Sequence, residues 1–155
     1  MTEVIKRSSK SAGDAGEYYV AYMLSRLGIS AALTTSGSSA VDIIATVDGS
    51  KSISIQVKGS WARSQPRQWI VGKHKPTVSP DFFYVFCNMS DDIDNKTTPE
   101  VFIVPSEAVG AHATWHHSVP LFKISKVNEE EYINRWDYIT AALETPGKEP
   151  SLDLV

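Results

Sequence analysis

The alternation of apolar and polar residues over VDIIATVDGSKSISIQVKGS (41–60) constrains the fold more than any other feature of the chain. In a strand, residues two apart share a face, so this pattern predicts two strands, at roughly 40–47 and 51–58. The Asp-Gly pair between them is typical of a hairpin turn. A shift of one residue in the pairing would expose every apolar side chain, so the pattern fixes which residues share a face.

Asp42, Gln56 and Lys58 are the polar residues that this pattern brings together. The two apolar faces coincide only if an odd number of residues joins the strands, such as a three-residue loop with Gly49 in a left-handed conformation. A two-residue Asp48-Gly49 turn would separate Asp42 from Gln56. Burying one apolar side chain is worth about 1.5–3 kcal/mol, so the pattern outweighs the turn preference. We therefore expect the three polar side chains on one side of the hairpin.

Two interpretations of this polar face stand side by side. A solvated face would explain it, and there an Asp–Lys pair contributes only about 0.2–1 kcal/mol. The other interpretation is a metal–phosphate site, because Mg²⁺ prefers oxygen ligands and one or two carboxylates can hold it. Asp42 would then be the principal ligand, assisted by the Gln56 side-chain oxygen and the Val57 carbonyl. Lys58 would polarise the attacking water or stabilise charge on the phosphate. Gly59 would allow another backbone to approach closely.

The remaining segments predict an α/β or α+β sheet with helices packed against it. In chain order we expect a helix over 8–28, a short strand over 29–35, the hairpin, strands over 81–89 and 100–105, and helices over 106–113 and 128–144. The buried face of the first helix is predicted to hold Ala15, Tyr18, Tyr19, Tyr22 and Leu27. On the last helix, Tyr132 and Trp136 are expected to anchor the core.

The segment 16–60, from GEYY to VKGS, resembles the core of the PD-(D/E)XK nuclease superfamily, and is nearest to its Holliday-junction-resolvase-like branch. The resemblance implies a restriction-endonuclease-like fold, a mixed central β-sheet flanked by helices, with a core order of α-β-β-β-α-β. It implies an active site of Glu17, Asp42, Gln56 and Lys58, and it adds Glu17 to the metal ligands Asp42, Gln56 and Val57. The implied cofactor is Mg²⁺ or Mn²⁺, and the implied chemistry is hydrolysis of phosphodiester bonds in DNA.

Gln56 departs from the form with glutamate that many members of this superfamily carry. Methylation-directed restriction enzymes of the superfamily use the same Q-x-K form, yet the amide removes one negative charge from the metal site. The alternative function is therefore a catalytically inactive nuclease-fold module that binds nucleic acid or protein. Glu17 also has a simpler explanation, as a first-turn acid stabilised by the helix dipole by about 0.3–1 kcal/mol.

Basic and aromatic residues are mixed in the segment 58–76, which suggests a surface that grips a nucleic-acid backbone. The candidate contacts are Arg63, Arg67, Lys73, Lys75 and Trp61. Trp69, in an apolar run, is expected in the core. Only residues 1–80 carry an excess of positive charge, so a basic surface is expected from that half of the chain alone. The net charge of −3 argues against a protein that coats DNA non-specifically.

A chain of 155 residues is expected to form a single domain over 1–155, with flexible tails at 1–10 and 145–155. It shows neither a signal-peptide pattern nor an apolar run long enough to cross a bilayer, so we expect a cytoplasmic protein without membrane contact. We expect no organic cofactor, and a homodimer is possible. Cys87 is expected to be a small core residue, and His112, His116 and His117 to be surface residues rather than metal ligands.

Overall fold

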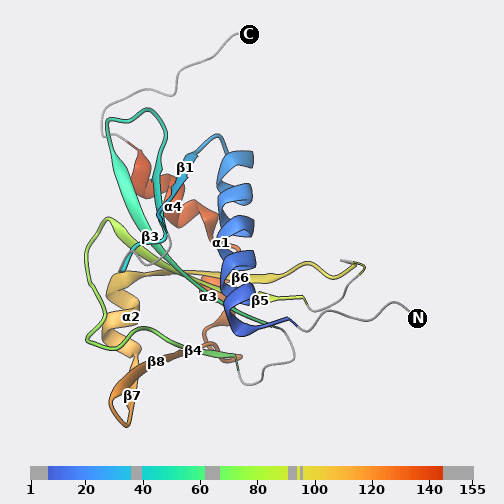
Figure 1. Cartoon of the computed structure of the whole chain (residues 1–155). Helices are drawn as coiled ribbons and strands as arrows, with labels where there is room; N and C mark the ends of the chain where they lie inside the picture. Colours follow the sequence, from blue (N-terminus) through green and yellow to red (C-terminus); the bar gives the residue numbers. More distant parts are fainter. Residues whose placement is uncertain (1–6, 36–39, 62–66, 91–93, 95, 145–155) are drawn as a thin grey trace.

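The computed structural model of the chain describes residues 7–35, 40–61, 67–90, 94 and 96–144 (Figure 1). In chain order the elements are α1 (Ser9–Arg26), β1 (Ser30–Leu33), β2 (Ile43–Thr46), β3 (Ser52–Trp61), β4 (Gln68–Ile70), β5 (Phe82–Met89), β6 (Glu100–Pro105), α2 (Ser106–His112), β7 (Thr114–His116), β8 (Val119–Lys123), α3 (Glu129–Tyr132) and α4 (Trp136–Leu143). Among these described segments, no helix is long and apolar enough to cross a membrane. The helix α1 begins inside the predicted N-terminal tail 1–10, and the predicted tail 145–155 lies outside the described residues.

A mixed sheet of five strands, in the order β1-β2-β3-β5-β6, forms the centre of the molecule. β3 and β5 are parallel, and the other neighbouring pairs are antiparallel. Helices flank this sheet, as predicted. One departure from the predicted core order lies between β3 and β5, where the described residues 67–81 hold the strand β4 in place of a helix. β4 joins β8 and β7 in a separate three-stranded sheet.

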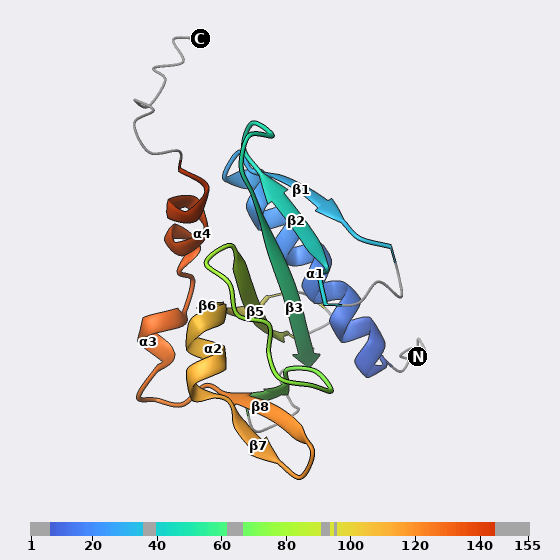
Figure 2. The same ribbon diagram turned by 90° about the vertical axis from the view of Figure 1, so that its left-hand side faces the viewer.

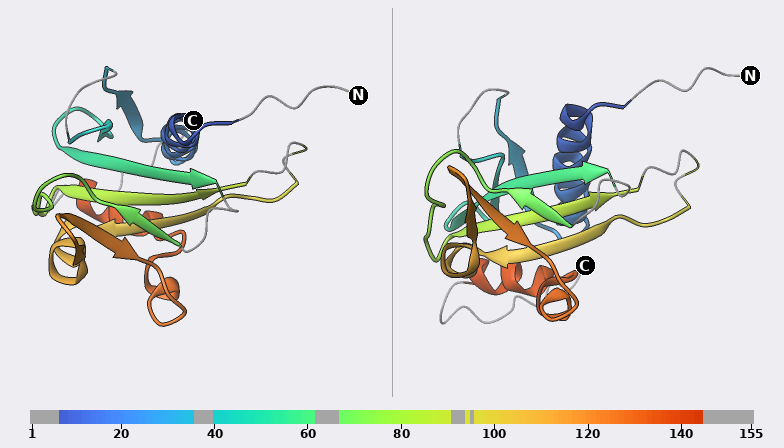
Figure 3. Two further views of the ribbon diagram at one scale, coloured as in Figure 1. Left: turned by 60° about the horizontal axis from the view of Figure 1, so that its bottom comes forward. Right: turned by 90° about the horizontal axis from the view of Figure 1, so that it is seen from below.

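Each face of the central sheet has its own hydrophobic cluster. On one face, Val20 and Leu24 of α1 and Ile139 of α4 pack against alternate residues of β2, β3, β5 and β6. On the other face, Trp69 of β4 and Phe122 of β8 pack against aromatic residues of β5 and β6. Figure 3 shows the central sheet between α1 on one side and the β4–β8 layer with α2 on the other. The lysine-bearing strand β3 is therefore covered by different elements on its two faces.

The register of the β2–β3 hairpin agrees with the hydrophobic pattern. Ile43 pairs with Ile55 and Thr46 pairs with Ser52, so the connection 47–51 has an odd number of residues. Gly49 adopts φ +83°, the left-handed conformation expected of it. The Thr46 hydroxyl stabilises this loop by accepting the Gly49 N–H at 2.9 Å. The tight two-residue turn suggested by Asp48-Gly49 does not form.

The buried face of α1 agrees with the prediction only in part, because Ala15 and Tyr19 pack against the core but the other three predicted residues do not. The buried residues are Ala12, Gly16, Val20 and Leu24. Tyr18 and Tyr22 are 62% and 57% exposed, and Leu27 is also exposed. At Ala12 and Gly16 the helix backbone lies directly on β3, which leaves no room there for a tyrosine ring. The Ser8 hydroxyl caps the helix by accepting the Ser11 N–H at 3.1 Å.

The predicted helix 128–144 is broken into α3 and α4. Asn134 lies at the break with φ +51°, and its N–H donates to the Val101 carbonyl at 2.9 Å. A left-handed residue cannot continue an α-helix, and this bond to β6 holds it in place. Tyr132 is buried and Trp136 is packed against the core, so both anchor the core as expected.

Candidate active site at the open end of the β2–β3 pair

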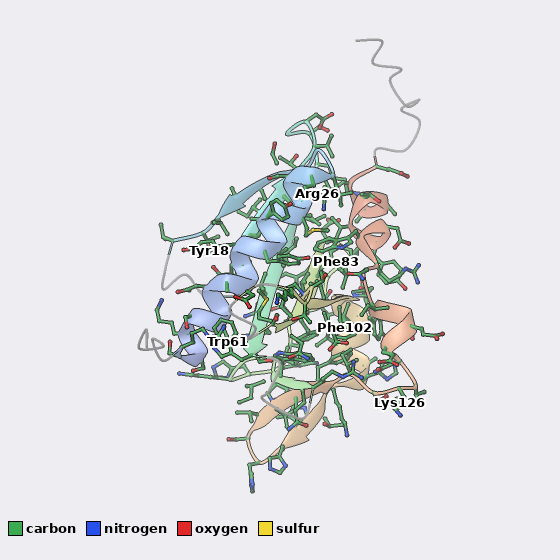
Figure 4. The ribbon with its side chains drawn as sticks, turned by 90° about the vertical axis from the view of Figure 1, so that its right-hand side faces the viewer. Tyr18, Arg26, Trp61, Phe83, Phe102 and Lys126 are labelled. Carbon is green, nitrogen blue, oxygen red and sulfur yellow. The ribbon has the colours of Figure 1, made fainter. Side chains whose placement is uncertain are left out.

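The helix α1 is seated on β3 through two glycines. A Cβ atom added at Gly59 would overlap the Ala12 carbonyl oxygen, and one added at Gly16 would lie 3.3 Å from the Val57 side chain. Trp61 adds a hydrogen bond to this contact, since its indole N–H donates to the Ser8 carbonyl at 2.9 Å. Figure 4 shows Trp61 beside the first turn of α1. This close contact fixes the helix so that Glu17, next to Gly16, lies over the lysine strand.

Gly59→Ala is expected to lower the free energy of unfolding by about 1–3 kcal/mol, because the methyl group collides with backbone that cannot move aside. The matched control is Gly13→Ala on the same helix, where a Cβ meets nothing within 4 Å. Alanine at that helical position should stabilise the protein by about 0.5–1 kcal/mol. Urea unfolding of the two variants measures both effects. Equal stabilities would contradict the close seating of α1 on β3.

A β-bulge at the start of β2 aims the Asp42 side chain. The Asp42 N–H donates to the Ile55 carbonyl at 2.9 Å, although Ile55 is already the register partner of Ile43. Asp42 and Ile43 thus both lie opposite one residue of β3, as in a β-bulge, which redirects the side chain of the extra residue. The Asp42 carboxylate consequently accepts the Val57 N–H at 2.7 Å. The strand pair opens at this point, and the carboxylate occupies the opening.

The Val57 carbonyl lies on the same edge of β3 as the Asp42 carboxylate. The N–H and C=O groups of one residue in an antiparallel pair point toward the same neighbouring strand. Because the Val57 N–H reaches Asp42, the Val57 carbonyl is also directed to the opening beyond β2. The backbone oxygen proposed from the sequence as a metal ligand therefore lies on the side of Asp42.

Glu17 and Asp42 form a carboxylate pair. Burial raises the pKa of Glu17, and the nearby Asp42 charge and a hydrogen bond between the two side chains raise it further. Burial also raises the pKa of Asp42, against the opposing effects of the Val57 N–H and the Lys58 charge. Two half-buried carboxylates side by side repel each other when both are ionised. The structure thus brings Glu17 from α1 to Asp42 from the hairpin.

Lys58 and Gln56 occupy one face of β3, since they are two residues apart in the strand. Both are half-buried. Burial lowers the pKa of Lys58, and the attraction of Asp42 partly opposes this change. The alternation of β3 puts Gln56 opposite Tyr84 and Lys58 opposite Phe86 in the parallel pairing with β5. Lys58 therefore lies within electrostatic reach of Asp42, and Gln56 lies two residues before it on the same face of the strand.

The donor set of this site suits a hard divalent cation. It offers the Glu17 and Asp42 carboxylates, the Gln56 amide oxygen and the Val57 carbonyl, all of them oxygen atoms of the kind Mg²⁺ prefers. Burial is the largest cause of the raised pKa of both carboxyl groups, and a cation bound between them would favour their ionised forms. Within the described ranges, no group of three or more His, Cys, Asp or Glu side chains is placed to hold a metal. Backbone and amide oxygens would thus have to complete the coordination.

The residues predicted to contact DNA differ in their exposure and in their interactions with the rest of the protein. Lys73 and Lys75 are exposed on the loop between β4 and β5, whereas Arg63 lies outside the described residues. Arg67 is mostly buried and forms ion pairs with Glu100 at 3.2 Å and Glu129 at 2.9 Å. These contacts fasten β4 to β6 and α3, so they favour a structural role for Arg67.

The structure shows how exposed the predicted tryptophan, cysteine and histidine residues are. One face of the Trp61 ring is covered by the Arg7 guanidinium, 4.4 Å from the ring centre. Trp69 is buried, as expected. Cys87 is also buried, and burial raises the pKa of its thiol to about 12. His112, His116 and His117 are exposed near the end of α2 and the β7–β8 turn. The expectation that these histidines are surface residues is confirmed.

Comparison with solved structures identifies the fold. A bacterial homing endonuclease superposes with a TM-score of 0.59 and 14% sequence identity, over 90% of this chain and 100% of that chain. The chain has the restriction-endonuclease-like nuclease fold. A Holliday junction resolvase of the archaeal hyperthermophile Archaeoglobus fulgidus gives a TM-score of 0.44 and 10% identity, over 77% of this chain and 93% of that chain. No protein-family model and no curated protein sequence matches the chain. The nuclease fold predicted from the segment 16–60 is thus confirmed on structural grounds alone.

The contacts that build the site were only partly readable from the sequence. Gly16 and Ala12 were not identified as the contact surface of α1, although their small size, at i and i+4 in a helix next to Glu17, is a signal for close packing. The bulge at Asp42 left no signal in the hydrophobic pattern. Within this nuclease fold, both features determine where the carboxylate pair lies.

Proposed function

We propose that this protein is a metal-dependent endonuclease that hydrolyses phosphodiester bonds in DNA. The observation that carries the proposal is the placement of Glu17 beside Asp42, with Lys58 within electrostatic reach, at an opening in the central sheet of a nuclease fold. A solvated hairpin face does not explain why Glu17, Asp42 and Lys58 are all half-buried against the cost of desolvation. A Mg²⁺ or Mn²⁺ ion at these oxygen atoms would supply Lewis-acid stabilisation of the phosphate and an activated water.

Each residue of the site has a defined part in this proposal. Glu17 and Asp42 would hold the cation, and the Val57 N–H fixes the orientation of the Asp42 carboxylate by donating a hydrogen bond to it. The Val57 carbonyl and the Gln56 side-chain oxygen complete the donor set. Lys58 donates hydrogen bonds to the attacked phosphate and stabilises the charge that develops on it. The attacking water forms a P–O bond and gives up a proton to solvent, one ester P–O bond breaks, and the leaving oxygen takes up a proton from solvent.

The experiment that tests the proposal is cleavage of supercoiled plasmid DNA by the full chain over a range of Mg²⁺ and Mn²⁺ concentrations. Nicked or linear product that depends on the metal is the expected result. Chelation with EDTA should abolish the product. A protein that binds DNA but produces no cut with either metal would favour the catalytically inactive module.

Gln56→Glu is expected to lower the Mg²⁺ concentration needed for half-maximal cleavage by about 10-fold. The substitution adds a carboxylate to a site with two, and a more negative ligand set binds a divalent cation more tightly. The measurement is the Mg²⁺ titration of the cleavage rate in the wild type and the variant. Ser54→Glu, on the same face of β3 but further from Lys58, is the matched control and should leave the titration unchanged. An unchanged Mg²⁺ requirement in Gln56→Glu would remove Gln56 from the metal site.

A further inference from the structure

Two segments of the chain, 49–80 and 108–128, contain no aspartate or glutamate. They are far apart in sequence, yet β4 in the first segment pairs with β8 in the second, with Trp69 opposite Phe122. The expectation that a basic surface comes from residues 1–80 alone is therefore incomplete. Folding adds a second acid-free segment, from the otherwise acidic half of the chain, to the same layer of the structure.

The two segments converge at one corner of the molecule. The Val71 N–H donates to the Pro120 carbonyl at 2.9 Å, which brings the residues after β4 to the β7–β8 turn. Val78, later in the same loop, packs over Gly110 of α2, where an added Cβ would lie 2.5 Å from its side chain. In Figures 1 and 2 the loop after β4 runs past α2, above the β7–β8 hairpin.

We name this convergence the basic corner. It consists of Lys73, His74, Lys75, His112, His116 and His117. All six side chains are exposed, and they include every histidine of the protein. None of the described residues forms an ion pair with Lys73 or Lys75. The corner thus presents cations and N–H donors to solvent without a compensating carboxylate in either segment.

The basic corner flanks the candidate active site on the face of the sheet that carries Lys58. The Thr77 N–H in the same loop donates to the Tyr84 hydroxyl at 3.1 Å, and Tyr84 is the register partner of Gln56. On β4, the Trp69 indole N–H donates to the Ser60 hydroxyl at 3.1 Å, and Ser60 is two residues beyond Lys58. The β4 layer and its loop are therefore attached directly beside the lysine face.

We propose that the basic corner binds the phosphate backbone of double-stranded DNA beside the bond that is cut, and that the α2 end and the β7–β8 turn complete a surface begun by Lys73 and Lys75. This inference rests on the proposed function, because it takes DNA as the substrate. Backbone binding needs exposed positive groups and N–H donors from several segments, without acids between them, and the corner provides this arrangement. If substitutions in the basic corner leave DNA binding unchanged, the corner does not bind DNA, and a negatively charged protein is the alternative partner.

The test measures binding of the full chain to a fluorescent DNA duplex of about 30 base pairs, without divalent metal, as a function of salt. Lys73→Gln/Lys75→Gln should reduce the slope of log K against log salt by about 1.8, or about 0.9 for each lost phosphate contact.

His116→Glu should weaken binding by about 3–10-fold at 0.1 M salt, and His116→Lys should strengthen it and raise the slope by about 1. His116 is exposed in a short strand, so both substitutions leave the core untouched.

The matched controls are Ser25→Glu and Ser25→Lys, which make the same changes of charge on the exposed side of α1, across the central sheet. They should leave affinity and slope unchanged. The proposal would be overturned if the substitutions at His116 and the two lysines left DNA affinity unchanged. It would also be overturned if the Ser25 variants changed DNA affinity as much as the His116 variants, even if the protein cuts DNA. If DNA affinity depends on the basic corner but the protein does not cut DNA, the proposed DNA-binding surface is supported and the proposed endonuclease activity is rejected.

Discussion

Asp42→Asn is expected to lower the rate of DNA cleavage by about 10²–10³-fold and to leave the protein at least as stable as the wild type. The loss of activity follows because the amide keeps the shape of the side chain but removes one of two carboxylate charges that would hold the metal. The amide oxygen can still accept the Val57 N–H, so the open end of the strand pair stays hydrogen-bonded. Cleavage rates and urea unfolding of the same preparation measure the two effects together.

The expected stability of Asp42→Asn follows from the sign of the pKa shift. The folded state raises the pKa of Asp42, mainly by burial, so ionisation of this group opposes folding. The stability that the protonated group contributes is fully present below its unfolded pKa, and it is lost as the pH rises through the raised pKa of the folded state. Asparagine cannot ionise, so the variant should gain stability over the wild type at neutral pH and lose this advantage in acid. Glu17, whose pKa is also raised, adds to the same trend.

Asp42→Ala is the control that separates charge from hydrogen bonding. It removes the acceptor of the Val57 N–H, and a buried donor left without a partner costs about 1–3 kcal/mol. Both variants should lose cleavage activity to a similar degree, but only the alanine variant should be less stable than the wild type. If Asp42→Asn cleaves DNA normally, Asp42 is a structural residue of the bulge and the proposed metal site is wrong.

The sequence was most informative where the structure depends on alternation. The parity of the hairpin could be deduced because a wrong register would expose Ile53, Ile55 and Val57 together, and the observed odd connection with Gly49 agrees. The nuclease fold was expected from the resemblance of residues 16–60 to a known superfamily, and the structure has that fold. Gly59 carried a usable signal, since a glycine inside a strand often marks close approach of another backbone, and α1 does approach it there.

Contacts between the backbones of distant elements were harder to predict from the sequence. The tyrosines of α1 suggested a buried face by their size, yet the helix buries Ala12 and Gly16 because it lies too close to β3 for larger side chains. The break at Asn134 depends on a bond to Val101 of β6, which no local pattern reveals. The pairing of β4 with β8 likewise joins segments whose charges looked unrelated along the chain.

Lys58→Met is expected to lower the cleavage rate by about 10²-fold while raising the stability of the protein at neutral pH. Methionine keeps the apolar stem of the side chain and removes the charge. Burial lowers the pKa of Lys58 in the folded state, so the charged form opposes folding, and stability from this group is gained as the pH rises through the lowered pKa. Lys51→Met, at the other end of the same hairpin, is the matched control and should cleave normally. Normal cleavage by Lys58→Met would exclude Lys58 from the chemistry.

The double variant Asp42→Asn/Lys58→Met tests whether the two groups act as a unit. If both serve the same phosphate, the double variant should lose little more activity than either single variant, since residues of one catalytic unit are not additive. The free energy of unfolding should also depart from additivity, but with a double-variant effect larger than the sum of the two single effects. Each single substitution removes the attraction between Asp42 and Lys58 and leaves the other charge half-buried without its partner, whereas the double substitution removes both charges. Its gain in unfolding free energy should therefore exceed the sum of the single gains, and simple additivity would show that the two charges do not interact.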